Sequence, residues 1–409
     1  MNTVILHLSD IHIKSNATNP VLDRADAICA AASTLTSQVA AVVVVVTGDI
    51  AYSGTQAEYA LAASFFADIR KQLQRRLGVS DVHFQLVPGN HDCDFQTATT
   101  VRELVMASNT STKADAAVID QVAAVQDAYV RFAHEFLTQT DPESGTNRLF
   151  RTVTHGVGPA RIDLMCLNTA WMSTKKELPA HLFVPQSIIE TCSTTLSDAH
   201  LVLAMFHHPY NWLQPTNSRA FKNAIESASD IIFTGHEHDP DHYTKRFAPR
   251  ETTEYVEGGL LQDSDDISAS SFNVVAVDMS GQRLKVHRFA WNGRLYSDTS
   301  KSREWMPFHR NMRRLRGTFQ TTEKFEAHLH EIGIPLLHKA KDLTLEDVYV
   351  SPDLKETPIT TKTKSSSGST IRDIPAFVIK EKRIFIIGSD EIGKTTWSFR
   401  DLRGPRLAA

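Results

Sequence analysis

Short apolar runs alternate with stretches of helical spacing along the first 300 positions of the chain. The runs are brief, continuous and rich in Val, Ile and Leu, which predicts buried β-strands. They span residues 4–8, 42–46, 82–87, 162–167, 201–206 and 231–234. Two later runs, 272–279 and 284–291, flank a short Ser-Gly turn and predict an antiparallel hairpin.

Helices are expected between several of these strands. Asn19 and Pro20 have the pattern of an N-cap followed by Pro at the first helical position, and apolar residues recur at helical spacing over 21–39. Thr55 and Glu58 have the spacing of a capping box. The helix that they open would bury one apolar face and end at Gly78. That face comprises Leu61, Phe65, Ile69, Leu73 and Leu77.

The alternation of strands and helices predicts a layered α/β core with a mostly parallel sheet and an antiparallel portion. We assign this core to residues 1–298, with a helical insertion at about 94–140 that is rich in Ala, Val and polar helix formers. Residues 299–356 are predicted to form a helical connector, and 357–370 a flexible linker of Thr, Ser and Lys. Residues 371–409 read as a strand, a loop and a helix start.

Composition adds that the protein is an ordinary globular one, since 42% of its 409 residues are hydrophobic and 22% are charged. The four cysteines form no CxxC pair and indicate neither a disulfide framework nor a zinc knuckle. The N-terminus lacks the pattern of a signal peptide, and the longest apolar run, 39–46, is too short to cross a bilayer. We therefore expect a soluble, cytoplasmic protein that does not engage a membrane.

The net charge of −4 is unevenly distributed along the chain. Residues 1–300 hold 23 basic and 33 acidic side chains, whereas residues 301–409 hold 20 basic and 14 acidic ones. The acidic first part argues against a large binding surface for duplex nucleic acid there.

Most residues of metal-binding or catalytic type directly follow a predicted strand. In chain order these are Asp10 and His12, then Asp49, then Asn90, His91 and Asp92, then His207 and His208, then His236 and His238. Open α/β sheets build their sites beyond the carboxyl ends of strands, so the five segments are expected to converge on one crevice. Carboxylates, an amide oxygen and imidazoles suit divalent metals, and seven candidate ligands suit two ions that share one carboxylate.

Each segment also has a plain structural interpretation when taken alone. Asp10-x-His12 could be a loop, Asp49 a turn residue, and Asn90 a capping residue, while the two adjacent histidines could be one buried and one exposed. Together, at successive strand ends, these interpretations would need five coincidences. Glycines at 48, 89 and 235 would let the chain turn sharply and bring the ligands together.

The ordered set D-x-H, G-D, G-N-H-D, H-H-P and G-H-x-H resembles the calcineurin-like metallophosphoesterase family over about residues 1–295. The resemblance implies an α/β sandwich of two mixed β-sheets flanked by helices, here with a C-terminal extension. It implies two divalent metal ions, which could be Mn, Fe, Zn or Mg. One ion would be held by Asp10, His12, Asp49 and His238, and the other by Asp49, Asn90, His207 and His236, with Asp49 bridging.

The implied reaction is hydrolysis of a phosphodiester or a phosphomonoester. A water between the two ions would lose a proton and attack phosphorus in line. His91 fits the general acid that protonates the leaving oxygen, and Asp92 could orient its ring. The alternative for Asp92 is a helix or turn cap. The other functions considered are a nuclease or nucleotidase effector domain of a longer NTPase fusion, and a non-catalytic scaffold with a relict metal site.

Three aromatic residues near the expected crevice, Trp171, Tyr210 and Trp212, could stack on a base or sugar, or could simply be core or rim packing. A nucleotide or nucleic acid is therefore a candidate partner.

Residues 388–395 match the P-loop pattern G-x-x-x-x-G-K-T, with Gly388, Gly393, Lys394 and Thr395 as nucleotide-binding candidates. The chain ends 14 residues after Thr395, which leaves no later strand to supply an acidic magnesium partner. The segment weakly resembles the start of a STAND-type or NACHT-like NTPase module. We therefore expect an incomplete module without ATPase activity, in a fragment or truncated relative of a longer effector–NTPase fusion.

Overall fold

The computed structural model describes residues 2–309 together with 354–355 and 370–371. Gaps in the first range fall at 36–38, 109–113, 139–147, 158–159, 195–196, 198, 249–250, 264–265 and 267. The chain divides into two compact units, Met1–Thr318 and Phe319–Ala409. In the second unit, strands β14 (Leu354–Lys355) and β15 (Thr370–Ile371) form an antiparallel pair. Of the predicted connector, residues 299–309 are described and belong to the first unit. Apart from these residues and the β14–β15 pair, the connector, the linker and the P-loop, including Gly388, Gly393, Lys394 and Thr395, lie outside the described residues, so those domain boundaries stay predictions.

Two mixed sheets form the centre of the first unit. In the part of the chain that the structure describes, the first sheet has seven strands in the order β12-β11-β10-β1-β2-β3, with β13 paired to β11. Its strands are β1 (Asn2–Leu8), β2 (Val39–Val46), β3 (Val82–Leu86), β10 (Ser271–Asp278), β11 (Arg283–Trp291), β12 (Tyr296–Asp298) and β13 (Met306–Pro307). Strands β1, β2 and β3 are parallel, whereas β10 runs antiparallel to β1.

The second sheet has six described strands in the order β4-β5-β6-β7-β9-β8. They are β4 (Phe150–Val157), β5 (Ala160–Leu167), β6 (Leu201–Met205), β7 (Ile231–Thr234), β8 (His242–Ala248) and β9 (Glu251–Glu257). The four inner strands are parallel, and the two edge strands β4 and β8 are antiparallel to their neighbours.

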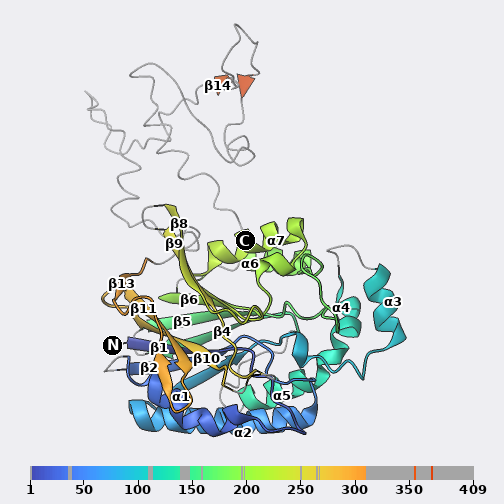
Figure 1. Ribbon diagram of the computed structural model, residues 1–409. Coiled ribbons are helices and arrows are strands. Elements are labelled where there is room, and N and C mark those ends of the chain that lie inside the picture. The colour runs from blue at the N-terminus through green and yellow to red at the C-terminus, as the bar shows by residue number, and fades with distance from the viewer. Residues whose placement is uncertain are drawn as a thin grey trace, which may run out of the picture. The chain divides into compact units, whose positions relative to one another are not determined.

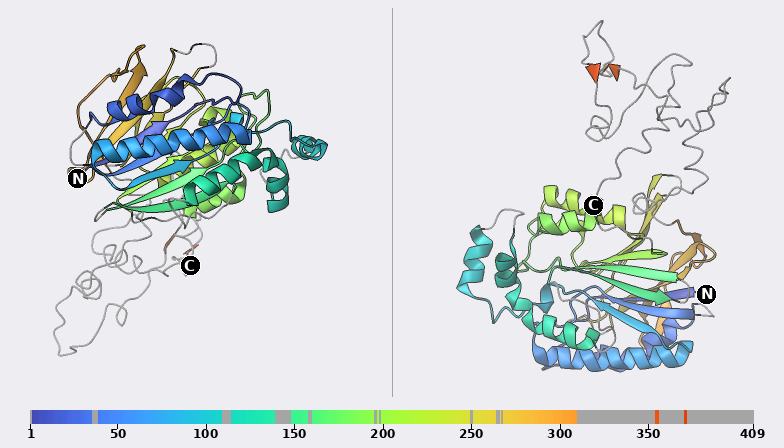
Figure 2. Two further views of the ribbon diagram at one scale, coloured as in Figure 1. Left: turned by 90° about the horizontal axis from the view of Figure 1, so that it is seen from below. Right: turned by 180° about the vertical axis from the view of Figure 1, so that it is seen from behind.

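Helices cover the outer face of each sheet (Figures 1 and 2). Helices α1 (Ala25–Ala32), α2 (Gln56–Leu77) and α5 (Asp127–Thr138) pack on the first sheet, and α6 (Gln186–Thr194) and α7 (Pro215–Ala228) on the second. Helices α3 (Thr100–Ser108) and α4 (Ala116–Ala123) lie at one end of the sheets. This arrangement confirms the expected sandwich of two mixed sheets flanked by helices. No helix among the described residues is both long and apolar enough to cross a membrane.

The continuous apolar strands are explained by burial on both faces. Side chains alternate between the two faces of a strand. In β2, Val42, Val44 and Val46 pack in the cluster under the outer helices, whereas Val43 and Val45 pack in the cluster between the sheets. A strand in this position needs apolar residues at every step, and it places its carboxyl end at one edge of the core.

The structure shortens the first predicted helix and adds elements that the pattern did not indicate. Instead of one helix over 21–39, the chain forms a 3₁₀ turn at Pro20–Arg24 and helix α1, and β2 already begins at Val39. Within 94–140, the described residues form α3, α4, a 3₁₀ turn at Ala124–Gln126 and α5. Strands β4, β8 and β9 were missed because Thr, His, Lys and Glu interrupt their apolar residues.

The helix predicted after Thr55 forms as expected and ends at Gly78, whose φ of 65° is the left-handed conformation that glycine adopts easily. Only half of the capping box forms through side chains. The Glu58 carboxylate accepts the Thr55 N–H at 2.9 Å, but the Thr55 hydroxyl accepts no hydrogen bond among the described residues.

Candidate metal centre

The five segments predicted to converge do meet beyond the ends of β1, β2, β3, β6 and β7. Four overlapping sets of side chains hold ligand atoms within 4.8 Å of one another. These sets are Asp10, His12 and His238; Asp10, Asp49 and His207; His12, Asp49 and His91; and His207, His208 and His236. All seven predicted metal ligands belong to this cluster, since Asn90 contacts two of its histidines.

Asp49 lies at the middle of the cluster and is 1% exposed. Its Oδ2 is 3.4 Å from Nε2 of His12 and 3.4 Å from Nε2 of His207, while its Oδ1 accepts the His91 N–H at 2.7 Å. One carboxylate oxygen therefore faces imidazoles from both halves of the site.

One half of the site is built around the amide oxygen of Asn90. This oxygen lies 3.0 Å from Nε2 of His207 and 3.0 Å from Nδ1 of His236, and the two nitrogens are 3.2 Å apart. The other ring nitrogen of His207 donates to the carbonyl oxygen of Thr47 at 2.7 Å, which turns Nε2 toward the cluster.

The other half is built around Asp10, which is fully buried. Its Oδ1 lies 3.2 Å from Nε2 of His238, and its Oδ2 accepts the hydroxyl of Ser9 at 2.5 Å and the His236 N–H at 3.2 Å. Nδ1 of His12 is 3.3 Å from the carbonyl oxygen of Gln262, which directs Nε2 toward Asp49.

Strained backbone is concentrated at the same place. Seven non-glycine residues among those described have positive φ, and five of them are candidate ligands. The five are Asp10, His12, Asp49, His236 and His238. Asp and His tolerate this conformation better than most residues, yet each still costs energy, so such residues gather where a site dictates the backbone.

The glycines next to the candidate ligands help to bring these residues together in two ways. Gly48 has a φ of 97°, so it makes a turn that other residues resist. Gly89 serves close approach instead, because a Cβ there would collide with the Asp49 carboxylate. Gly235 is similar, since its Cβ would meet Ser9 and the Thr47 carbonyl oxygen.

This donor set fits divalent cations. Ligands that lie about 2.0–2.2 Å from a shared ion are roughly 3 Å apart, which is the spacing found here. Oδ1 of Asp10 is buried, and its partner among the described residues is another candidate ligand, His238, at 3.2 Å, so both atoms could turn to a shared cation. Carboxylates, an amide oxygen and imidazoles match borderline metals such as zinc, iron and manganese better than they match calcium.

The pKa shifts of the clustered side chains also indicate that this site favours a positive charge. Burial raises the pKa of Asp49, but the imidazoles of His207 and His12 more than offset this and hold it well below its usual value. Burial lowers the pKa of His207, yet Asp49 and Asp10 raise it to about 10. Burial and the charge of His207 lower the pKa of His236 to about 3. The carboxylates of Asp49 and Asp10 thus favour the protonated form of His207. A metal cation bound here would supply that positive charge instead.

His208 is as buried as His207, so the suggestion that one of the pair is exposed was wrong. Its Nε2 donates to the Glu177 carboxylate at 3.0 Å, and its Nδ1 pairs with the Thr169 hydroxyl at 3.2 Å. Both ring nitrogens of His208 therefore have partners other than Asn90. Sequence reasoning missed Thr169 and Glu177, because they lie in a loop without a recognisable pattern.

His91 is held at the rim of the cluster. Its Nδ1 donates to the carbonyl oxygen of Tyr52 at 2.8 Å, and its ring lies against those of His12 and Tyr52 at centroid distances of 4.7 and 5.3 Å. The ammonium group of Lys14 lies 4.3 Å above the Tyr52 ring. Tyr52 is 39% exposed, and no motif in the chain indicated its role.

Asp92 behaves as a turn cap, which was the alternative interpretation. Its two oxygens accept the backbone N–H groups of Ala51, Ile50 and Gly89 at 2.9, 3.2 and 2.9 Å, and the Tyr59 hydroxyl at 3.0 Å. The expected contact with the His91 ring is replaced by the Tyr52 carbonyl oxygen. Asp92 therefore ties the loop after β2 to the loop after β3.

We expect Asp92→Asn to destabilise the protein by about 2–6 kcal/mol, because in either orientation the new amide nitrogen would face two buried hydrogen-bond donors and each costs about 1–3 kcal/mol. Tyr59→Phe removes one hydrogen bond and should cost only about 1 kcal/mol. Urea unfolding of both variants in chelator measures the difference without a contribution from bound metal. Equal losses would show that the Asp92 hydrogen bonds do not hold the two loops together.

The aromatic residues near the site differ in role. Trp171 is fully buried and donates Nε1–H to the Phe183 carbonyl oxygen at 2.8 Å, so it is a core residue. Trp212 is partly exposed, lies 4.1 Å from the His236 ring and donates to Glu237. Tyr210 packs between Phe206 and Phe221. Of the three, Trp212 is beside the candidate ligands.

Comparisons with known proteins give one clear assignment. A model of the calcineurin-like phosphoesterase family matches residues 3–240, which is more than half of the chain and includes every residue of the cluster described above. No curated protein matches the chain.

Several solved structures are similar to the chain. Wild-type Vps29 from Entamoeba histolytica, complexed with zinc, shares 14% identity over 74% of this chain and 98% of that chain, with a TM-score of 0.27. A hypothetical protein from Thermus thermophilus shares 13% over 73% and 96%, with a TM-score of 0.34. Phosphopantetheinyl hydrolase from Mycobacterium tuberculosis shares 14% over 63% and 90%, with a TM-score of 0.33.

The family match covers the segments that supply the clustered histidines and carboxylates, and those segments come together in the sandwich that the residue pattern led us to expect. The chain belongs to the calcineurin-like phosphoesterase family.

Proposed function

We propose that this protein is a phosphoesterase that depends on two divalent metal ions. One ion would be bound by Asp10, His12, Asp49 and His238, and the second by Asp49, Asn90, His207 and His236. The observation that supports this most directly is the position of Asp49 Oδ2, at 3.4 Å from both His12 and His207. A carboxylate oxygen between two imidazole groups is suited to bridge two cations.

When bound, two such ions would lower the pKa of a water molecule and neutralise the phosphate oxygens of the substrate. The chain's own residues would hold these parts in place. The carbonyl oxygens of Thr47 and Gln262 fix the rings of His207 and His12, and Ser9 fixes the Asp10 carboxylate. Groups held in this way need little reorganisation during the reaction.

We assign the general acid to His91. Since a carbonyl oxygen only accepts hydrogen bonds, the contact with Tyr52 places a proton on Nδ1 and leaves Nε2 for the site. A proton on Nε2 would pass to the leaving oxygen of the ester. Asp92 has no part in this step, because its oxygens already bind three amides and the Tyr59 hydroxyl.

The surface beside the site favours a small ester over a polynucleotide. A cavity next to His236 and His238 is lined by four carboxylates, together with Arg288 and Lys301. The carboxylates are Glu237, Asp239, Asp241 and Glu257. Burial and the nearby acidic groups Asp241, Glu237 and Asp239 raise the pKa of Glu257, which shows how crowded the negative charge is. A polyanionic strand would be repelled there.

Metal removal and a substrate panel test the proposal together. We expect chelator-treated protein to lose hydrolysis of bis-p-nitrophenyl phosphate or p-nitrophenyl phosphate, and Mn²⁺, Zn²⁺, Fe²⁺ or Mg²⁺ to restore it. The panel should also contain cyclic nucleotides, single-stranded DNA, double-stranded DNA and RNA. Preferred cleavage of polynucleotides would support the nuclease alternative. Less than one metal ion per chain and no turnover in any metal would indicate a non-catalytic scaffold.

A further inference from the structure

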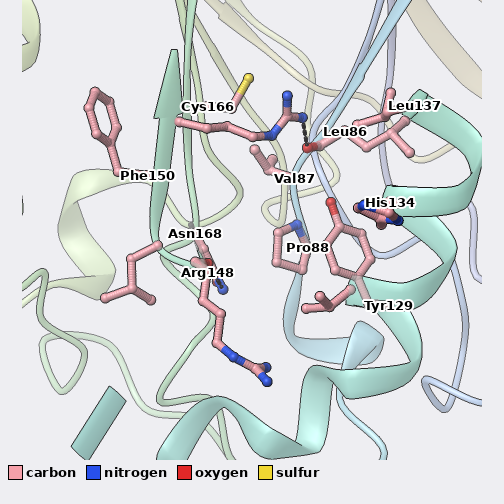
Figure 3. Close-up of a pocket in the computed structure, with 14 residues that line it drawn as sticks. Leu86, Val87, Pro88, Tyr129, His134, Leu137, Arg148, Phe150, Cys166 and Asn168 are labelled. Carbon is pink, nitrogen blue, oxygen red and sulfur yellow. Dashed lines mark hydrogen bonds between the residues drawn. The ribbon is translucent and has the colours of Figure 1, made fainter. Parts of the chain in front are cut away.

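A cavity of about 70 Å³ lies apart from the candidate metal ligands, between helix α5 and the adjoining ends of β3, β4 and β5 (Figure 3). Most of its wall is apolar and is made by side chains such as Leu86, Val87, Leu137 and Phe150. The cavity is large enough for more than a single water molecule. Its polar side chains are Tyr129, His134, Arg148, Arg151, Cys166 and Asn168.

Arg151 contributes a positive charge to this cavity without a described carboxylate partner. Its guanidinium donates to the side-chain oxygen of Gln85 and, at 2.9 Å, to the carbonyl oxygen of Leu86. Both acceptors are neutral. A guanidinium has five N–H donors, so these two bonds leave three.

Tyr129 brings an unused donor to the same space. The residue is only 6% exposed, yet its hydroxyl makes no hydrogen bond with any described residue. Figure 3 shows this hydroxyl pointing into the cavity. Burial raises the pKa of Tyr129 well above its usual value, so the group is a neutral O–H donor. A ligand oxygen in the cavity would give this hydroxyl an acceptor.

Arg148 also lines the cavity, but its charge is compensated. Its guanidinium pairs with Asp120 at 3.2 Å and with Asp127 at 2.9 Å. Of the two lining arginines, Arg151 is therefore the one whose guanidinium meets no described carboxylate. One such cation suits a ligand with one negative charge and an apolar body. A planar carboxylate matches the fork of a guanidinium, whereas a phosphate dianion would bring a second charge with no cation to meet it.

We propose that this cavity binds a small monocarboxylate, whose oxygens accept hydrogen bonds from Arg151 and Tyr129 and whose apolar part packs against Leu86, Val87 and Phe150. The site is separate from the metal cluster and would serve a ligand other than the phosphate ester.

Butyrate is a suitable probe, with butyramide as its neutral counterpart, in calorimetric titrations of the full chain. We expect butyrate to bind at least about tenfold more tightly than butyramide, since a charge-assisted pair contributes more than about 1.4 kcal/mol, or a factor of ten. Arg151→Met should weaken butyrate binding by about tenfold or more. Tyr129→Phe should weaken it by a smaller factor. Because this variant removes only one oxygen atom, it still tests the proposal if Arg151→Met fails to fold.

Two controls place the ligand in the cavity. Arg148→Met, which removes a compensated charge, should change butyrate affinity less than about threefold. Asp49→Asn should leave it unchanged, which excludes binding of butyrate to the metal ions. Equal binding of butyramide, or full binding to both Arg151→Met and Tyr129→Phe, would overturn the proposal. Displacement of butyrate by a lower concentration of inorganic phosphate would also overturn it in favour of a phosphate site.

Discussion

Replacing Asp49 with Asn is expected to abolish phosphoesterase activity, with kcat/KM falling by at least about a hundredfold and both metal ions bound more weakly. The reason is the central position of this residue. Its Oδ2 is 3.4 Å from His12 and from His207, so losing one negative charge affects both halves of the site. An Asn side chain has nearly the same shape, and the change therefore tests charge and metal binding rather than packing.

The measurement combines metal content by mass spectrometry with turnover of a nitrophenyl phosphate ester. Asp68→Asn, on the exposed face of α2, is a matched control that makes the same chemical change away from the site. It should retain full activity and metal. If Asp49→Asn keeps two metal ions and wild-type turnover, the assignment of a shared carboxylate is wrong.

The apolar pattern predicted the fold well where strands are buried on both faces. Strand β7 was predicted with its observed bounds, Ile231–Thr234, because each of its residues is fully or nearly fully buried. Strand β4 was missed because its burial alternates and its outward residues include Thr154 and Gly156. The helix expected over 21–39 was too long, since the apolar residues near its end belong to β2. Periodicity alone cannot separate a short buried strand from the end of a helix.

The candidate site could be located from the sequence because its residues follow strands whose ends share one edge of the core. What could not be predicted were the contacts made by residues without a motif. Tyr52 takes the place expected of Asp92 beside His91, and it does so through a backbone carbonyl oxygen, which any residue could offer. Glu177 reaches His208 from a loop 31 positions away. Such partners depend on tertiary structure, and residue type gives little indication of them.

We expect His91→Ala to reduce kcat in a way that depends on the leaving group. A general acid contributes about 10²–10⁴-fold when the leaving oxygen is a poor leaving group, such as an alkoxide. A nitrophenolate leaves readily without a proton, so loss of the acid should matter much less for it. The variant should therefore lose about 10²-fold or more on an alkyl phosphate ester and less than about tenfold on a nitrophenyl ester.

This comparison separates proton donation from metal binding, which is necessary because His91 also lies within 4.8 Å of His12 and Asp49. If His91 were mainly a metal ligand, both substrates would lose activity equally and the metal content would fall. His181→Ala is a suitable control, since this exposed histidine makes a similar Nδ1 contact with a backbone carbonyl oxygen, that of Pro179, at 2.8 Å. A steeper dependence of kcat on the leaving-group pKa in His91→Ala than in wild type and His181→Ala would identify Nε2 of His91 as the proton donor, whereas parallel dependences would assign the proton to another group.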